Sequence, residues 1–246
     1  MKCEAFLGFT ISELLVAMSI IGIVVAITVP TVISKYQQKS MLALLKKNYV
    51  ELQENLLVLS TENNNKSFYK SILSKQGSKS VEETAGEFIK GFYTITNDCE
   101  DTAQPCFADS YRTINSSTRT NFSCSDGYNV LLKGGAAMCI IPADSAVEAD
   151  EDAGIEAKDA IPAHIFIDVN GTDRPNIGGR DLFSFYVYDF YTIDDGKTDD
   201  YIGPEKIKDG TAEEARETLF NSSCLSSSDG TGCFGKILND DWKMNY

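Results

Sequence analysis

The stretch that decides the fold is LLVAMSIIGIVVAITV, which runs from Leu14 to Val29 near the start of the chain. Its only polar side chains are those of Ser19 and Thr28, and it carries no charge. Apolar neighbours on both sides extend it to about 25 residues, and a helix needs roughly 20 apolar residues to cross the hydrocarbon core of a bilayer. We therefore expect a helix that is long and apolar enough to span a membrane.

The rest of the chain has the composition of a folded globular protein. Of its 246 residues, 43% are hydrophobic and 24% are charged, which argues against disorder throughout. Lys and Arg number 22 against 36 Asp and Glu, so the net charge is −14. Because phosphate binding requires a basic surface, nucleic acid is not expected as the main partner.

A carboxylate, Glu13, stands at the start of the apolar run. A charge at the centre of a membrane helix costs about 2.5–3.5 kcal/mol on insertion scales, so such residues usually have a functional reason. A secretory signal peptide or plain signal anchor is the simpler alternative. Against it, residues 1–8 contain a single Lys offset by Glu4, and no small-residue cleavage site separates the apolar run from the following helical pattern.

The stretch Gly8-Phe9-Thr10-Ile11-Ser12-Glu13-Leu14-Leu15-Val16 resembles the prepilin-type motif of type IV pilins, competence pilins and type II secretion pseudopilins. The resemblance implies that a prepilin peptidase cleaves after Gly8, which removes the leader 1–8, and that Phe9 is then N-methylated. Glu13 becomes the fifth mature residue, where the family places its assembly glutamate. Pro30 becomes the twenty-second, which matches the helix-kinking proline of many pilins.

The helical pattern continues beyond the apolar run. Apolar side chains recur at spacings of three and four, namely Leu42, Leu45, Tyr49, Leu52, Leu56 and Leu59, until the poor helix formers of Thr61–Ser67. A helix over residues 9–60 would be about 78 Å long at 1.5 Å per residue, with 9–33 as its transmembrane and assembly half. Pro30 should bend this helix or break it locally because proline lacks the N–H donor.

Residues 61–246 are expected to form one globular domain. Ser80 and Glu83 make a capping-box pattern within a region of one or two short helices, residues 67–95. Thr211–Phe220 is a further helical segment, and Ile237–Leu238 with Trp242–Met244 could form a last hairpin. Strands are expected at Tyr128–Lys133, Ala137–Ile141, His164–Val169 and Leu182–Ile193, which are rich in β-branched and aromatic residues.

A long helix followed by antiparallel strands indicates an α+β fold, and this arrangement looks like the pilin architecture. Aromatic residues alternate onto both faces of the last strand-like run. We therefore expect one face of the sheet to lie on the long helix. The other face should lie under a loop or a neighbouring subunit.

The segment from Phe166 to Phe183 resembles a strand–loop–strand signature of pilin-like proteins. Asp-x-Asn-Gly favours a tight turn, because Asp and Asn bond nearby backbone and Gly tolerates positive φ. Its oxygen ligands, from Asp168, Asn170, Asp173 and Asp181, also suit Ca²⁺. A structural turn is the preferred interpretation, because the spacing does not complete an EF-hand, and calcium is the alternative; no other cofactor is expected.

Seven cysteines indicate a disulfide framework. Cys3 lies in the leader, which leaves the even set Cys99, Cys106, Cys124, Cys139, Cys224 and Cys233 without a CxxC motif. Six cysteines allow fifteen connectivities. The expected pairs are those nearest in sequence: Cys99–Cys106, Cys124–Cys139 and Cys224–Cys233. Oxidised cysteines place the globular domain outside the cytoplasm.

The basic residues suggest the opposite topology. Lys35, Lys39, Lys46 and Lys47 follow the apolar run, whereas Lys2 alone precedes it. The positive-inside rule would leave the C-terminal side in the cytoplasm. We follow the cysteines and the family resemblance, and predict a single-pass inner-membrane protein whose globular domain is extracytoplasmic.

The sequence offers no catalytic motif. GxSxG, HExxH, P-loop and GxGxxG patterns are absent, and the only His, His164, sits in an apolar strand. The acidic segment Asp144–Ala160 holds seven carboxylates and one Lys, which is typical of a solvated loop; a metal or partner surface is the alternative. We expect a non-enzymatic protein.

The resemblance implies a structural subunit of a type IV pilus or a secretion pseudopilus. Its partners would be like subunits, a prepilin peptidase, the assembly platform and the inner membrane. Once assembled, it would lie in a pilus or a periplasmic pseudopilus. The alternative function is a single-pass, membrane-anchored extracytoplasmic binding protein that does not polymerise.

Overall fold

The long helix expected from the sequence is present as α1, Ile11–Glu62, in a computed structural model that describes residues 10–64, 67–75, 79–144, 162–196 and 203–246. The chain divides into two compact units, Met1–Ser40 and Met41–Tyr246, and α1 contributes residues to both. Leader residues 1–8, Phe9 and nearly all of the acidic segment lie outside the described residues.

The second part of α1 is amphipathic, as its leucine spacing predicts. Leu45, Leu52, Leu56 and Leu59 are buried in the main core, and Leu42 and Tyr49 pack against it. Asn48 is the polar exception on this face, and its Nδ2 donates to the carbonyl oxygen of Leu44 over 2.9 Å. Burying a leucine side chain stabilises a fold by about 1.5–3 kcal/mol, so this face of α1 contributes substantially to the stability of the globular unit.

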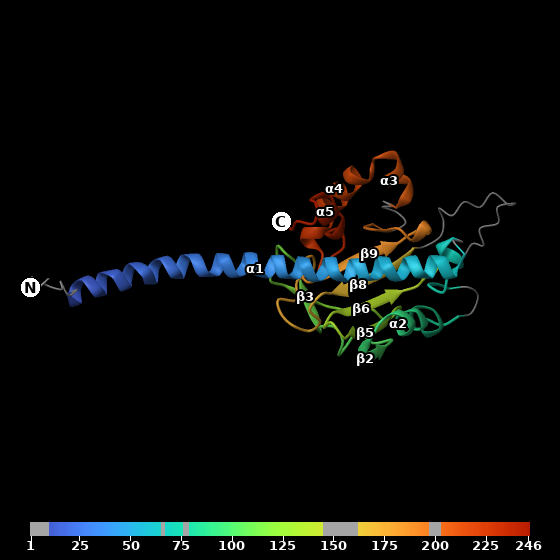
Figure 1. Ribbon diagram of the computed structural model, residues 1–246, viewed down its shortest axis with the longest axis horizontal. Coiled ribbons are helices and arrows are strands. Elements are labelled where there is room, and N and C mark those ends of the chain that lie inside the picture. Colours follow the sequence, from blue (N-terminus) through green and yellow to red (C-terminus); the bar gives the residue numbers. More distant parts are fainter. Residues whose placement is uncertain (1–9, 65–66, 76–78, 145–161, 197–202) are drawn as a thin grey trace, which may run out of the picture. The chain divides into compact units, whose positions relative to one another are not determined.

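A six-stranded sheet forms the centre of the globular unit (Figure 1). Its strand order is β10-β9-β8-β6-β5-β2, and every neighbouring pair is antiparallel. The strands are β2 (Ile95–Glu100), β5 (Tyr128–Leu132), β6 (Ala137–Ile141), β8 (Ala163–Asp168), β9 (Leu182–Val187) and β10 (Ile193–Asp194). The α+β class with a long N-terminal helix and an antiparallel sheet is therefore confirmed.

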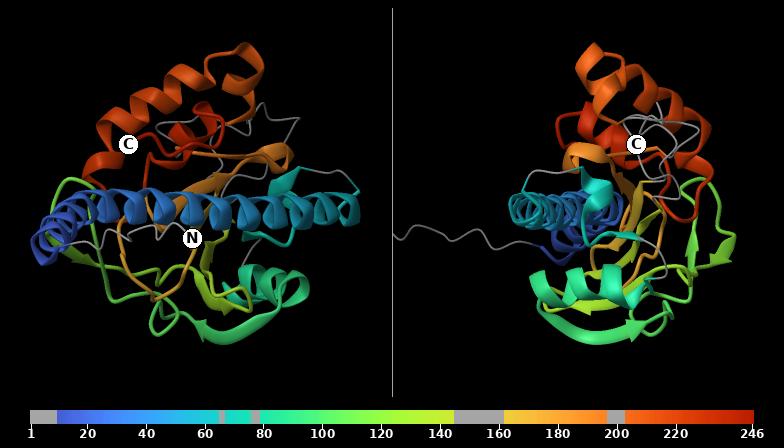
Figure 2. Two further views of the ribbon diagram at one scale, coloured as in Figure 1. Left: turned by 60° about the vertical axis from the view of Figure 1, so that its left-hand side comes forward. Right: turned by 90° about the vertical axis from the view of Figure 1, so that its right-hand side faces the viewer.

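The two faces of the sheet have different cover. Met138, Ile140, Ile165 and Phe183 point into the main core with the leucines of α1. The opposite face is covered by the segment that carries β3 (Ser110–Arg112) and β4 (Arg119–Asn121). Within the globular unit, the sheet therefore lies between the part of α1 from Met41 to Glu62 and this hairpin (Figure 2). The expectation of a helix on one face and a loop on the other is correct for the described residues.

The second core on that face consists largely of aromatic and cysteine side chains. It contains Phe107, Tyr111, Phe122 and Phe166 together with two disulfides. Phe122 contacts Phe107, Tyr111 and Phe166 with ring centroids 4.8, 5.5 and 5.4 Å away. β2, β3 and β4 were not predicted, because their polar sequences lack the alternation that marks a half-buried strand.

The predicted central strands match the structure to within one residue at each end. The exception is the last run, because β9 ends at Val187 and the 3₁₀ turn η4, Asp189–Tyr191, follows before β10. The Asp189 carboxylate accepts hydrogen bonds from Ser67 Oγ and Phe68 N at 2.8 and 2.9 Å. Phe190 then adopts φ of 56°, which no strand residue can adopt.

Short helices connect α1 to the sheet. η1 (Phe68–Lys70) is followed by β1 (Ser74–Lys75), which pairs in parallel with β7 (Ala143–Asp144). A short π-helix, η2 (Glu82–Gly86), leads directly into α2 (Glu87–Phe92). The capping box is confirmed: Ser80 N donates to Glu83 Oε2 and Glu83 N donates to Ser80 Oγ, at 2.8 and 3.2 Å.

The C-terminal region is helical. It comprises α3 (Pro204–Asp209), α4 (Ala212–Ser222), η6 (Cys224–Ser226) and α5 (Phe234–Asn239). The expected helix near residues 211–220 is therefore present, but the hairpin at Ile237–Leu238 and Trp242–Met244 is wrong. Phe234 and Ile237 fit one face of a helical turn and are fully buried, which stabilises a helix where the short apolar pair suggested a strand.

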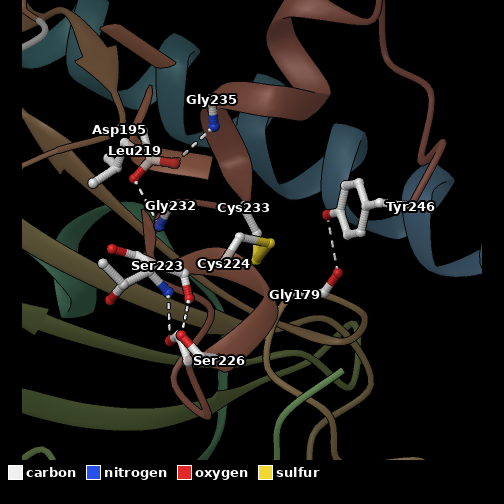
Figure 3. Close-up of a disulfide and its surroundings, with 12 residues drawn as sticks. Gly179, Asp195, Leu219, Ser223, Cys224, Ser226, Gly232, Cys233, Gly235 and Tyr246 are labelled. Atoms are coloured by element: carbon white, nitrogen blue, oxygen red, sulfur yellow. Dashed lines mark hydrogen bonds between the residues drawn. A yellow bond between two sulfur atoms is a disulfide. The ribbon is translucent and has the colours of Figure 1, made fainter. Parts of the chain in front are cut away.

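All three predicted disulfides are present: Cys99–Cys106, Cys124–Cys139 and Cys224–Cys233. The third closes the Ser- and Gly-rich loop beside Gly179 and Tyr246 (Figure 3). The contact with Gly179 is close, because a Cβ there would lie 2.4 Å from Cys233 Sγ. Gly179 also has φ of 78°, so glycine is required at this turn.

Candidate functional site: the N-terminal helix and the buried carboxylates

The apolar part of α1 exposes its large side chains all round the helix. Among them, Leu14, Met18, Ile23 and Ile27 are between 51% and 67% exposed. By length and composition α1 can cross a membrane, although a signal sequence near an N-terminus can be equally long and apolar. So much exposed apolar surface is unfavourable in water, so this segment needs lipid or other helices around it.

The hydroxyl groups of this segment are satisfied within the helix. Ser19 Oγ donates to the Leu15 carbonyl and Thr28 Oγ1 to the Val24 carbonyl, both over 2.8 Å. Thr31 Oγ1 donates to Thr28 O over the same distance. Internal satisfaction of polar groups is what a hydrocarbon environment requires.

Pro30 lies inside α1, and the helix continues through it. The local break that we considered does not occur. Pro30 removes one N–H donor, at a typical cost of about 3 kcal/mol, but the turns on either side remain helical.

Glu13 is held by its own neighbour. Its Oε2 accepts hydrogen bonds from both N and Oγ1 of Thr10 at 2.8 Å, and Glu13 N donates back to Thr10 Oγ1 at 3.3 Å. This is a capping box at the first turn of α1. Thr10 is not among the site residues expected from the sequence, although the T-x-x-E spacing of residues 10–13 is the recognisable signal of such a box. Phe9 and the expected cleavage site at Gly8 lie outside the described residues.

The predicted oxygen ligands of the β8–β9 loop have different environments. Asp168 is fully buried, where its Oδ2 accepts the hydroxyl of Tyr111 at 2.5 Å and its Oδ1 accepts Asn170 N at 3.1 Å. Burial, and then the charge of nearby Asp181, raise the pKa of Asp168 to about 8. With no cation beside it, a buried acid with this pKa is protonated at neutral pH, and both of its oxygens already accept hydrogen bonds within the fold.

Asp181 is also fully buried and caps the turn that precedes β9. It accepts backbone N–H groups from Asn176, Ile177 and Leu182, at 2.6, 2.6 and 3.1 Å. Burial raises its pKa to about 6, against the opposing effect of these hydrogen bonds. Its oxygens therefore organise the backbone of the loop.

The other two ligand candidates do not complete a cation site. Asn170 Nδ2 donates to the carbonyl oxygens of Asp173 and Arg174, as expected for a structural turn, and the Asp173 side chain is exposed. Within the described ranges, no group of three or more His, Cys, Asp or Glu side chains could hold a metal. The geometry favours the structural turn, and calcium stays a prediction that chelation can test.

Two further buried carboxylates, absent from our predictions, attach the C-terminal helices to the sheet. Asp194 pairs with Arg216 of α4 through Arg216 Nε and Nη2, at 2.9 and 2.5 Å. Asp195 accepts Gly235 N at 2.8 Å and Gly232 N at 3.4 Å (Figure 3). Burial raises the pKa of Asp195 to about 6. In the sequence, the only sign of these two residues is that they form a consecutive Asp pair after the aromatic-rich run that begins at Leu182.

His164 has a structural environment. Its Nε2 lies 2.6 Å from Ser184 Oγ, and its ring stacks on Tyr186 with centroids 4.1 Å apart. Burial lowers the pKa of His164 to about 4, so the ring is neutral at physiological pH.

In comparisons with protein-family models, curated proteins and solved structures, nothing matches this chain. Function must therefore be argued from the residues and their geometry.

Proposed function

We propose that the protein is a structural subunit, a pilin or pseudopilin, that polymerises through its N-terminal helix into a type IV pilus or a type II secretion filament. The observation that carries the proposal is the motif of residues 8–16 directly before the exposed apolar part of α1. The three disulfides of the globular unit support an oxidising, extracytoplasmic location for it.

The apolar helix has two possible surroundings, lipid and other helices. Before assembly, lipid covers Leu14–Val29. In a filament, the same side chains pack against helices of other subunits, so transfer from membrane to filament does not expose apolar surface. The globular unit then faces outward and carries any adhesive or secretory specificity.

Glu13 favours the assembled state in this proposal. Thr10 donates two hydrogen bonds to Glu13 but supplies no positive charge. After cleavage behind Gly8, the Phe9 amine of a neighbouring subunit would supply one. A buried carboxylate keeps its desolvation cost unless it is paired, so pairing stabilises the subunit in the filament relative to the lone subunit in lipid.

The first experiment is mass spectrometry of the N-terminus of the membrane-purified protein. We expect loss of residues 1–8 and one added methyl group on Phe9. Replacing Gly8 by Leu should block this processing, whereas the matched change Gly22→Ala, inside the helix, should not. An intact residue 1, or cleavage far beyond Gly8, would instead favour the single-pass binding protein that does not polymerise.

The second experiment separates assembly from processing. Glu13→Ala should be processed but should fail to enter filaments, while Glu54→Ala, in the same helix but at an exposed position of the globular unit, should enter them normally. Normal incorporation of Glu13→Ala would refute the charge pairing.

A further inference from the structure

The arginines of this acidic chain are concentrated in one region. Of its five Arg residues, Arg112 and Arg119 lie in the β3–β4 hairpin and Arg174 and Arg180 in the β8–β9 loop. Arg112 and Arg119 are directly opposite in the hairpin. Arg112 N donates to Asn176 O at 3.1 Å, and Gly178 N donates to Arg112 O at 3.0 Å, which joins the hairpin to the loop. We call these four residues the arginine patch.

The charges of the arginine patch are not neutralised within the described part of the chain. None of the four forms an ion pair there, whereas the fifth arginine, Arg216, is paired with Asp194. Like charges directly opposite in a hairpin are destabilising. Burial, and also the neighbouring Arg112, lower the pKa of Arg180. Arg180 adds positive charge to the patch, although its guanidinium lies 5.3 Å from the Tyr246 ring and its Nη1 is buried without a hydrogen-bond partner.

The carboxylates of the same loops do not compensate for this charge. Asp168 and Asp181 are buried and bonded to Tyr111 and to backbone N–H groups. Asp109 and Asp173 are exposed and form no ion pair with described residues. The arginine patch therefore retains the capacity to bind carboxylates from outside, which guanidinium groups recognise through paired hydrogen bonds.

A complementary surface lies at the far edge of the sheet. Six carboxylates are exposed on the edge strand β2, on the residue that follows it and on the η2–α2 segment. We call them the acidic edge: Glu82, Glu83, Glu87, Asp98, Glu100 and Asp101. Lys90 bridges Glu82 and Asp98 at 3.1 and 3.6 Å, which leaves most of the negative charge unpaired. β2 is three strands from β8, or about 14 Å at the usual strand spacing, so the acidic edge is separate from the β8–β9 loop.

We propose that the arginine patch of one copy binds the acidic edge of a second copy. Subunits with a net charge of −14 repel one another, and a local cationic surface gives them one attractive orientation. Because the two surfaces are different, the contact is heterologous and repeats as an open chain, as a filament requires. The inference deepens the proposed function, on which its biological meaning rests, by naming a contact between globular units.

The test uses the full chain in detergent, which covers the apolar part of α1, and measures self-association by sedimentation velocity at low salt. One variant reverses the charge of the arginine patch at two exposed positions, Arg119→Glu with Arg174→Glu. A second variant reverses the charge of the acidic edge at two positions, Glu87→Lys with Asp101→Lys. The matched control is Glu213→Lys with Glu214→Lys on α4, which changes net charge by the same amount as the edge variant.

Each reversal alone should weaken association about tenfold, and a mixture of the two variants should restore it, because opposite charges then face each other. The control should associate like the wild type. Far-ultraviolet circular dichroism and thermal unfolding establish that each variant is folded.

Unchanged association of either folded variant would overturn the proposal, as would equal weakening by the control, which would indicate a net-charge effect only. Binding of the wild type to phosphatidylglycerol vesicles that the patch reversal abolishes, without any loss of self-association, would assign the patch to an anionic surface instead. The proposed function fails on a different result, namely retention of residues 1–8. The two failures are therefore distinguishable.

Discussion

Asp168 should make the protein less stable as pH rises through the neutral range. Its pKa is raised from 3.8 to about 8 in the folded chain, because it is fully buried and close to Asp181. In the unfolded chain the acid ionises near its ordinary pKa. Between these two values, unfolding releases a proton, so the free energy of unfolding falls with increasing pH.

The slope is about 1.4 kcal/mol per pH unit for one group that is protonated in the folded state and ionised in the unfolded state. The effect of Asp168 is best isolated between pH 6.5 and 8. Asp181 and Asp195 have pKa values of about 6, so they also lower the free energy of unfolding as pH rises, but mainly at lower pH. The pKa of His164 is lowered, so it destabilises the fold only as pH falls below about 6.5. Asp168 should therefore dominate a loss of about 2 kcal/mol across this window.

The assay is urea unfolding of the oxidised protein at pH 6.5, 7, 7.5 and 8. Asp168→Asn carries no ionisable group and should show a nearly flat profile. The matched variant Asp173→Asn, at an exposed site in the same loop, should keep the wild-type slope. A wild-type profile that is already flat, or an Asp168→Asn profile as steep as the wild type, would refute the reasoning.

Three further outcomes are expected. Leu52→Ala should lower the free energy of unfolding by about 2–5 kcal/mol because Leu52 is fully buried, whereas Leu57→Ala, at a site 68% exposed on the same helix, should change it little; equal effects would contradict the packing of α1. Replacing Cys224 and Cys233 together by Ser should cost about 2–4 kcal/mol in urea unfolding, and an unchanged midpoint would show that the loop holds without its disulfide. Chelation with EDTA should leave the thermal midpoint unchanged, whereas a rise of several degrees on adding Ca²⁺ would support the calcium prediction for the β8–β9 loop.

Much of the fold could be predicted from the sequence, for reasons that are local. The leucines of α1 recur at helical spacing, and the central strands are short β-branched runs. The disulfides join cysteines separated by 7, 15 and 9 residues, so loop closure alone favoured those pairs. The hairpin predicted after Ile237 failed because burial beside Tyr49 and Trp242, rather than the local pattern, selects a helix at Phe234.

Some residues of the candidate site could likewise be recognised in the sequence, and others only in the fold. The apolar run and Glu13 are visible in the sequence, and Thr10 could have been found from its spacing to Glu13. The carboxylates of the β8–β9 loop looked equivalent in the sequence, but Asp168 and Asp181 are buried while Asp173 is exposed. Tyr111 packs over the sheet and donates to Asp168, whereas the backbone of its own turn encloses Asp181.

By itself, the sequence determined an apolar N-terminal helix, an amphipathic continuation, an antiparallel core and the most economical disulfide pairing. These follow from periodicity and short-range chain closure. Tertiary structure alone decided that the β3–β4 hairpin covers the second face of the sheet, that four acids become buried, and that four arginines gather in one patch. The reason is physical. Burial, pKa and charge density depend on contacts between residues that are distant in the chain, and a local sequence pattern carries no information about such contacts.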